Sequence, residues 1–324
     1  KQLRVDTSQD IRELTRLWED ARHLEAEARN STRESQQREW SDKAHLDLDR
    51  TRERLRDLLT ADADSQHTFL AGVRLTMESV HQYRARSIPF ELFQNADDAA
   101  VQLDELAHES DPHARRYPFV VSTDRGSLAF AHWGRPINDS RAGSGIEELR
   151  ASGFHRDLEK MLMLGASDKW APGEAEEVTG KFGLGFKSVF LLSDAPRILS
   201  GRLAVRVLGG VYPQNITGPE HEAITGRLAE LGERRNGTLI ELPLRDGFAD
   251  KAEEAVSHFR ELAPILAVFA RRTNRIVLRT ADREESLEWA PREVNGAPQV
   301  RIGSLPGAAS RGLPAHGRRI RAAH

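Results

Sequence analysis

The stretch that decides the fold is IPFELFQNADDAAVQ, residues 88–102. Ser87-Ile88-Pro89 breaks a preceding helix, and the stretch predicts a new one that runs to about His108. Glu91, Asn95 and Asp98 fall on one face of that helix, since each residue turns by about 100°. The opposite face, which can anchor the helix in a core, carries Leu92, Phe93, Ala96, Ala99 and Ala100. A polar stripe of this kind is most often a solvated face, so on its own it does not define a site.

A second signal is VTGKFGLGFKSVFLLSD, residues 178–194, in which three glycines precede an apolar run that predicts a helix. Gly180, Gly183 and Gly185 would let backbone N–H groups turn toward a bound anion at the helix N-terminus. The loop is not a Walker loop, because Phe186 separates Gly185 from Lys187, and its spacing is not the dinucleotide fingerprint. Taken alone, it fits a structural turn as well as a phosphate loop.

The rest of the chain alternates predicted helices and strands. Predicted strands are PFVVSTD (118–124), SLAFAHW (127–133), LAVRVLGG (203–210), GTLIELPL (237–244), RIVLRT (275–280), SLEWA (286–290) and QVRIG (299–303). Further helices are predicted over 67–85, 154–164, 218–233 and 249–269. The first two strands form a hairpin around Arg125-Gly126, which implies antiparallel pairing. We therefore expect an α/β sandwich with a mixed, mostly antiparallel sheet covered by helices, not a doubly wound parallel sheet.

The chain divides by composition into three regions. Residues 1–64 predict a helical N-terminal extension of two helices. The extension either packs on other parts of the protein or forms a dimerising coiled coil, and the lack of a sustained heptad favours the first. Residues 65–248 predict the main domain, and residues 249–324 continue it or link it to a missing region. The basic tail 310–324 fits a disordered end better than a nucleic-acid arm. A start at Lys1 suggests a fragment.

Composition excludes several classes of protein. The 324 residues include 39% hydrophobic and 30% charged residues, and the formal net charge is −3, so neither nucleic-acid binding nor membrane-surface binding is indicated. The absence of Cys removes disulfides and cysteine nucleophiles and fits a cytoplasmic location. No apolar run approaches the roughly 20 residues of a membrane span.

The two motifs together resemble a known family. ELFQNADDA looks like the N-box, and TGKFGLGFKSVF like the second glycine box, of the GHKL ATPases, which include gyrase, the ninety-kilodalton heat-shock chaperone, histidine kinases and MutL. The chaperone and sacsin-like branch is the most similar, and the resemblance covers about residues 65–245. It implies a Bergerat-type ATP-binding domain with ATP and Mg²⁺ as ligands.

The resemblance also implies roles for the stripe. Glu91 would be the general base that activates water for attack on the γ-phosphate. Asn95 would be the protein ligand of Mg²⁺, a cation that takes most of its other ligands from phosphates and water. Asp98 would hold water or a loop near the adenine end.

Other positions carry implied contacts to the nucleotide. Phosphate contacts would come from Gly180, Phe182, Gly183, Leu184, Gly185, Phe186 and Lys187, and the long segment before them would be a lid. Lys169, in GASDKW, reaches a phosphate or is a plain surface lysine. Thr238 would meet the adenine, or is simply a β-branched residue that opens a strand.

One motif departs from the family. Where the family has Asp-x-Gly, this chain has His132-Trp133-Gly134, as sacsin-like relatives often replace that Asp. A neutral histidine can still accept a hydrogen bond through one ring nitrogen. Asn138 or Asp139 could serve instead, and Trp133 could belong to the core.

The function implied is an ATP-binding and ATP-hydrolysing domain with slow turnover, the conformational switch of a larger, bacterial protein. The alternative is a nucleotide-gated binding or assembly module that does not hydrolyse ATP, in a defence or stress system. Expected partners are ATP, other domains of a longer chain or partner proteins, and a nucleotide-dependent second copy, with no membrane. A histidine kinase is less in keeping with the sequence, because no phospho-acceptor helix with a suitable His precedes ELFQNADDA. A topoisomerase or mismatch-repair protein would need a transducer domain, for which residues 250–324 are too short.

Overall fold

The structure is a computed structural model. It describes residues 70–71, 84–107, 117–124, 126–139, 154, 157–162, 186–210, 212–232, 236–280, 282–294 and 297–306, with the side chains of 159, 160, 162 and 289–306 left out. The predicted N-terminal extension, most of the predicted helix 67–85 and the basic tail lie outside these residues.

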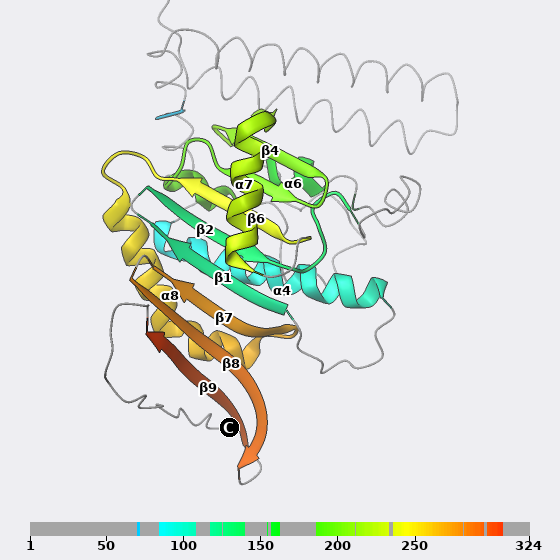
Figure 1. Cartoon of the computed structure of the whole chain (residues 1–324), viewed down its shortest axis with the longest axis vertical. Coiled ribbons are helices and arrows are strands. Elements are labelled where there is room, and N and C mark those ends of the chain that lie inside the picture. The colour runs from blue at the N-terminus through cyan, green and yellow to red at the C-terminus, as the bar shows by residue number, and fades with distance from the viewer. Residues whose placement is uncertain are drawn as a thin grey trace, which may run out of the picture.

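A nine-stranded sheet forms the centre of the described chain, in the order β5-β4-β3-β6-β2-β1-β7-β8-β9 (Figure 1). Every neighbouring pair is antiparallel except β1 and β7, which are parallel. This confirms the predicted mixed, mostly antiparallel sheet. The strands are β1 (Tyr117–Thr123), β2 (Ser127–His132), β3 (Arg197–Ser200), β4 (Leu203–Leu208), β5 (Tyr212–Asn215), β6 (Thr238–Pro243), β7 (Thr273–Arg279), β8 (Arg283–Val294) and β9 (Ala297–Pro306).

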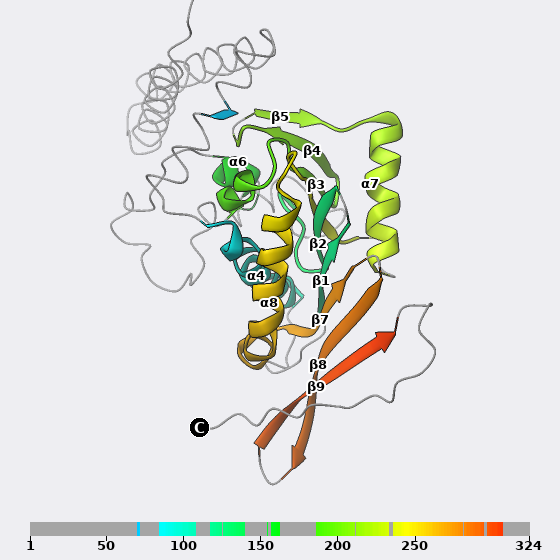
Figure 2. The same ribbon diagram turned by 90° about the vertical axis from the view of Figure 1, so that its left-hand side faces the viewer.

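Helices cover both faces of the sheet (Figure 2). One face carries α7 (Gly218–Leu231), and the other carries α4 (Ile88–Leu106), α6 (Asp157–Leu162) and α8 (Ala249–Phe269). Two short 3-10 helices are η1 (Ala85–Ser87) and η3 (Phe186–Leu191). The strands β8 and β9 extend beyond the helical cover.

Helix α4 begins where the sequence predicts, with Pro89 in its first turn. Proline fits there because the first N–H groups of a helix have no partner within it. The predicted apolar face is confirmed, since all five of its residues, Leu92, Phe93, Ala96, Ala99 and Ala100, are buried. Helix α8 likewise spans the predicted residues 249–269.

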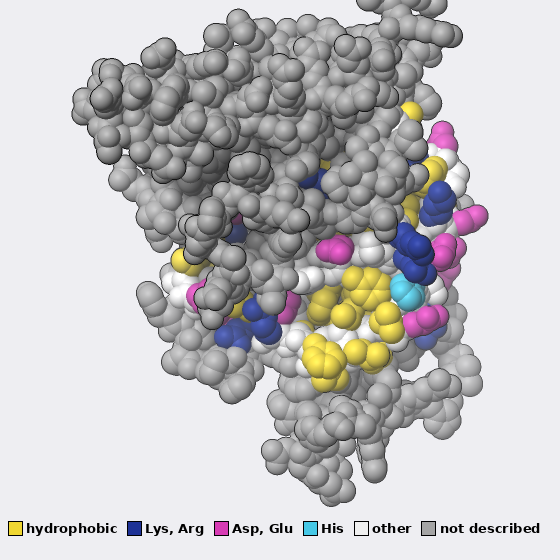
Figure 3. Space-filling model, turned by 180° about the vertical axis from the view of Figure 1, so that it is seen from behind, with side chains coloured by type: hydrophobic (Ala, Val, Ile, Leu, Met, Phe, Trp, Pro, Cys, Tyr) yellow, Lys and Arg dark blue, Asp and Glu magenta, His cyan; other side chains and the backbone are white. Residues whose placement is uncertain are grey.

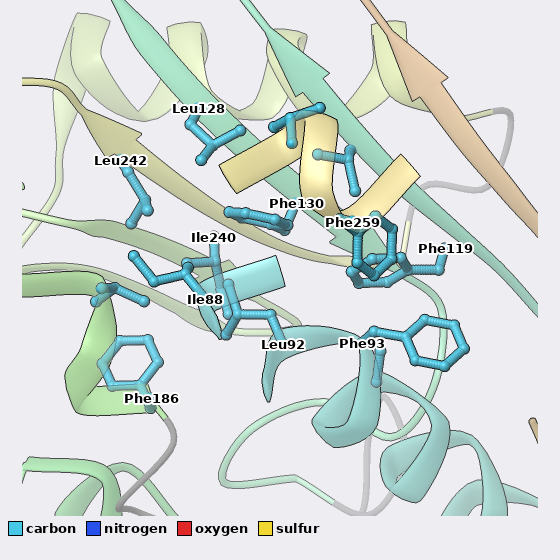
Figure 4. Close-up of a cluster of buried hydrophobic side chains, with 14 of the residues drawn as sticks. Ile88, Leu92, Phe93, Phe119, Leu128, Phe130, Phe186, Ile240, Leu242 and Phe259 are labelled. Atoms are coloured by element: carbon cyan, nitrogen blue, oxygen red, sulfur yellow. The ribbon is translucent and has the colours of Figure 1, made fainter. Parts of the chain in front are cut away.

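Two hydrophobic clusters hold the layers together. The larger lies between the sheet and the helices α4 and α8, where the rings of Phe93, Phe119 and Phe259 lie within about 6 Å of one another (Figure 4). The smaller joins Ile224, Leu228 and Leu231 of α7 to the opposite face of the sheet. Burial of these side chains is the main favourable contribution to folding.

Helix α4 is also tied to the connection between α8 and β7 by one carboxylate. Asp97 is buried and accepts hydrogen bonds from the backbone N–H groups of Arg271, Arg272 and Thr273 at 2.8–2.9 Å, and from the Thr273 hydroxyl at 2.9 Å. Hydrogen bonds to an ionised group are among the strong ones in proteins. Asp97 therefore fixes the start of β7 against α4.

Some elements differ from the predicted ones. The helix that follows the glycine-rich loop is, in its described part, the 3-10 helix η3 and not an α-helix. The strands β3 and β5 are not among the predicted elements. Helix α8 exposes Ile265 and Phe269. Hydrophobic side chains gather on the face of the molecule seen in Figure 3.

Candidate functional site

The polar face of α4 presents Glu91 and Asn95, one helical turn apart. Both side chains are partly buried, and within the described ranges neither makes a hydrogen bond or an ion pair. Burial raises the pKa of the Glu91 carboxyl above its ordinary value, because a charged group loses hydration there. Two oxygen-bearing side chains thus stand side by side without a partner in the described chain.

Asp98 faces a different partner. Its carboxylate forms an ion pair with the Arg271 guanidinium, in the connection between α8 and β7. Burial raises the pKa of Asp98, the arginine opposes that shift, and Asp97 adds to it. Asp98 thus lies on the side of α4 that is tied to β7, whereas Glu91 and Asn95 have no such tie.

The end of β2 packs directly against α4. The Arg135 N–H donates a hydrogen bond to the Ala99 carbonyl at 2.8 Å. A Cβ atom at Gly134 would lie only 2.6 Å from the Ala100 nitrogen and the Ala99 carbonyl carbon. Glycine is required there by close approach of two backbones. This contact brings the residues around His132 to the helix that carries Asn95.

A row of polar side chains crosses three strands at this end of the sheet. His132 pairs with Thr238, and Thr238 pairs with Ser200, so the three lie in register on β2, β6 and β3. Side chains alternate along a strand, so His132 shares its face with Phe130, whose ring belongs to the cluster under α4. The hydroxyls of Ser200 and Thr238 are 2.6 Å apart, and Ser200 also accepts the Ile137 N–H at 2.8 Å.

The His132 ring is held neutral. Burial and the nearby Arg135 guanidinium lower the pKa of His132 to about 4, burial being the larger cause. Its Nδ1 atom accepts a hydrogen bond from the Gly134 N–H at 3.2 Å. His132 is therefore an uncharged side chain at neutral pH.

The free energy of unfolding should depend on pH through His132. The pKa of His132 is near 6.5 in the unfolded chain and about 4 in the folded chain. Between these two pH values the unfolded state therefore binds a proton that the folded state does not bind. Stability is thus full above about pH 6.5 and falls as the pH falls. Between pH 7.5 and pH 5.0 the loss due to this group is about 2 kcal/mol. Urea unfolding of wild type and His132→Gln at both pH values measures it.

In that experiment the pH dependence should shrink by about 2 kcal/mol in His132→Gln. The exposed His221 of α7 offers the control, since His221→Gln should keep the wild-type dependence. An equal loss of stability on acidification in wild type and His132→Gln would contradict the assignment.

The segment after Gly134 is fixed by a buried arginine that the sequence analysis did not single out. The Arg135 guanidinium donates to Asp157 at 2.7 Å and to the side chain of Gln102 at 2.8 Å, and it lies 3.7 Å over the Phe154 ring. A guanidinium has five fixed donors, which suits such a junction. Arg135 therefore joins α4, the end of β2 and α6.

The two alternative residues of this segment differ in their surroundings. The Asn138 side chain accepts the Leu158 N–H at 2.8 Å and so serves as a cap for α6. Asp139 is buried, lies 3.3 Å from the Arg202 guanidinium, and its carboxylate oxygens make no hydrogen bond.

Two glycines make room for Trp133, which is buried in the smaller cluster with α7. A Cβ at Gly237 would lie 2.8 Å from the Trp133 Nε1 atom, and one at Gly232 would lie 2.2 Å from the ring. The packing of Trp133 therefore explains the glycine at position 237, whatever the role of Thr238.

The residues that the sequence analysis assigns to phosphate binding are described only in part. Lys169, Gly180, Phe182, Gly183, Leu184 and Gly185 lie outside the described residues, as does most of the proposed lid. Phe186 and Lys187 belong to η3, and both side chains are about 1% exposed. The Phe186 ring packs in the larger cluster against Phe190.

Neither a membrane span nor a protein-only metal cluster is found in the part of the chain that the structure describes. None of its helices is both long and apolar enough to cross a membrane. Its His, Asp and Glu residues form no group of three or more that could hold a metal ion.

Comparison with known proteins does not assign the chain to a family. No family model matches the chain, and no curated protein matches it. The function must therefore be argued from the residues and their arrangement.

Proposed function

We propose that the chain binds Mg²⁺-ATP between α4 and the ends of β2 and β6, and hydrolyses it. The observation that carries this proposal is the pair Glu91 and Asn95, partly buried and unpartnered in the described chain, on the helix to which β2 is joined. Within the described residues no hydrogen bond competes with a ligand for the polar atoms of these two side chains, which remain open to water or to a bound group. The resemblance of both motifs to the GHKL ATPases supplies the identity of that ligand.

The residues fit the chemistry of Mg²⁺-ATP. The Asn95 amide oxygen is a neutral ligand of the kind Mg²⁺ takes, and it has no competing hydrogen bond in the described residues. Bound Mg²⁺ would supply positive charge that offsets the charge developing on the phosphates. Asn95 would hold the cation, and Gly180, Gly183 and Gly185 would bind the phosphates through backbone N–H groups.

Glu91 would act on the attacking water. Its carboxylate would accept a proton from water as the oxygen attacks the γ-phosphorus and the bond to the β-phosphate oxygen breaks. A raised pKa makes a carboxylate a stronger base, which favours this role. Lid closure over ATP would change the surface shown to other domains of a longer chain, to partner proteins or to a second copy.

Asn95→Ala is expected to weaken Mg²⁺-ATP binding about tenfold or more, since a ligand of the cation is lost. Without Mg²⁺, in excess chelator, the affinities of variant and wild type for ATP should be similar. Isothermal titration with and without Mg²⁺ measures both. Gln94→Ala, at the exposed neighbouring position, is the control and should bind as the wild type does.

Phosphate release by the purified protein tests the proposal as a whole. ATP binding with phosphate release supports it, and binding without release favours the non-hydrolysing assembly module. Absence of ATP binding in the presence of Mg²⁺ would refute it. An unchanged Mg²⁺ dependence in Asn95→Ala would refute the role of that residue.

A further inference from the structure

The hydrogen bond between Gly134 and His132 fixes which ring nitrogen carries the proton. The Gly134 N–H points at Nδ1 at 3.2 Å, so Nδ1 must offer its lone pair. A neutral imidazole has one N–H, and it must then be at Nε2. His132 therefore presents a donor at Nε2, while its one acceptor is already used.

Nε2 is available to a ligand. Among the residues that the structure describes, it has no hydrogen-bond partner. The Gly134 contact with α4 is fixed by the Arg135 to Ala99 hydrogen bond, so the donor to Nδ1 cannot readily turn away. The tautomer is thus set by the backbone.

The neighbouring hydroxyls add donors and no charge. Ser200 and Thr238 have two hydroxyl hydrogens, and the hydrogen bond between them uses one. The other hydrogen is not used in that hydrogen bond, and the contact of Ser200 with the Ile137 N–H uses a lone pair of the Ser200 oxygen and not its hydrogen. No carboxylate belongs to this row of His132, Thr238 and Ser200.

We propose that His132 is a specificity-determining residue that donates a hydrogen bond to the base, so that a purine with an oxygen at position 6 binds at least as well as adenine. The inference rests on the proposed nucleotide binding. An amino group facing Nε2–H would place two donors against each other, whereas a 6-oxo group accepts. An unmatched buried donor weakens binding by about tenfold or more.

ATP and ITP are the probes, because their bases differ at position 6 and in the proton on N1. Titration of the purified protein with each in Mg²⁺ at pH 7.5 should give an ITP affinity within threefold of that of ATP, or tighter. His132→Asp replaces the donor by an acceptor and should favour ATP over ITP by tenfold or more. His221→Asp introduces the same charge on exposed α7 and should leave the wild-type ratio.

Each outcome decides one point. Wild-type protein that prefers ATP over ITP by tenfold or more overturns the inference while the proposed function stands. An unchanged ratio in a folded His132→Asp also overturns it. If that variant does not fold, the wild-type ratio alone decides. Protein that binds neither nucleotide refutes the proposed function itself.

Discussion

Glu91→Gln is expected to bind Mg²⁺-ATP with an affinity within about threefold of that of the wild type. Its rate of phosphate release should fall at least about 100-fold. The amide keeps the shape of the side chain but cannot take the proton of the attacking water. Binding would be preserved because, in the proposed site, other residues contact the phosphates and Mg²⁺. Titration of ATP and a steady-state phosphate assay measure the two quantities.

The control is Glu105→Gln, which changes the same group at an exposed position of the same helix. It should hydrolyse ATP at the wild-type rate. The wild-type rate should also rise with pH through the pKa of Glu91, which burial places above the ordinary value, because only the carboxylate accepts a proton. Equal turnover in Glu91→Gln and wild type would refute the assignment of the base.

Gly134→Ala is expected to lower the free energy of unfolding by about 3 kcal/mol. The new methyl group would lie 2.6 Å from two backbone atoms of α4, and backbone cannot move aside as a side chain can. Either β2 or α4 must shift, which breaks the hydrogen bond between Arg135 and Ala99 and disturbs the His132 ring. Urea unfolding measures the loss.

Gly126→Ala serves as the matched control, since nothing lies within 4 Å of a Cβ at that position. It should change the free energy of unfolding by less than about 0.5 kcal/mol. Equal stability of the two variants would contradict the close approach of β2 and α4. A folded Gly134→Ala would be expected to bind nucleotide more weakly, because its site is displaced.

Local patterns predict much of the fold. The helices α4 and α8 and the hairpin of β1 and β2 follow from apolar periodicity, from Pro89 and from Arg125-Gly126. These signals act within about twenty residues, so they survive the tertiary context. The short strand β3 has no alternation to reveal it, and β5 contains Pro213, which disfavours a strand reading.

Contacts between distant residues could not be predicted. The parallel pair of β1 and β7 joins segments about 150 residues apart, and nothing in either segment specifies the other. Asp97 could be identified as polar within ELFQNADDA, but its partners lie 174 to 176 positions further on. Charge and apolar pattern do not encode such pairings.

The residue types of the candidate site could be predicted from the sequence, but their contacts could not. The spacing of Glu91 and Asn95 places both on one face of α4, as the structure has them. Arg135 and Ser200 carry no motif of their own, and the tautomer of His132 depends on a backbone N–H two residues away. Because of that hydrogen bond, His132 offers a donor at Nε2, whereas the sequence led us to expect an acceptor.

The pairing of β1 with β7 has a consequence for the order in which the chain can fold. During synthesis β1 and β2 emerge about 140 residues before β7, so one edge of β1 stays unpaired until residue 279 has left the ribosome. Unpaired strand edges promote aggregation, and long-range pairings slow folding. The hydrogen bonds from Arg271, Arg272 and Thr273 to Asp97 would then form late and join helix α4 to a strand made long after it, before β8 and β9 can be added at the edge of β7.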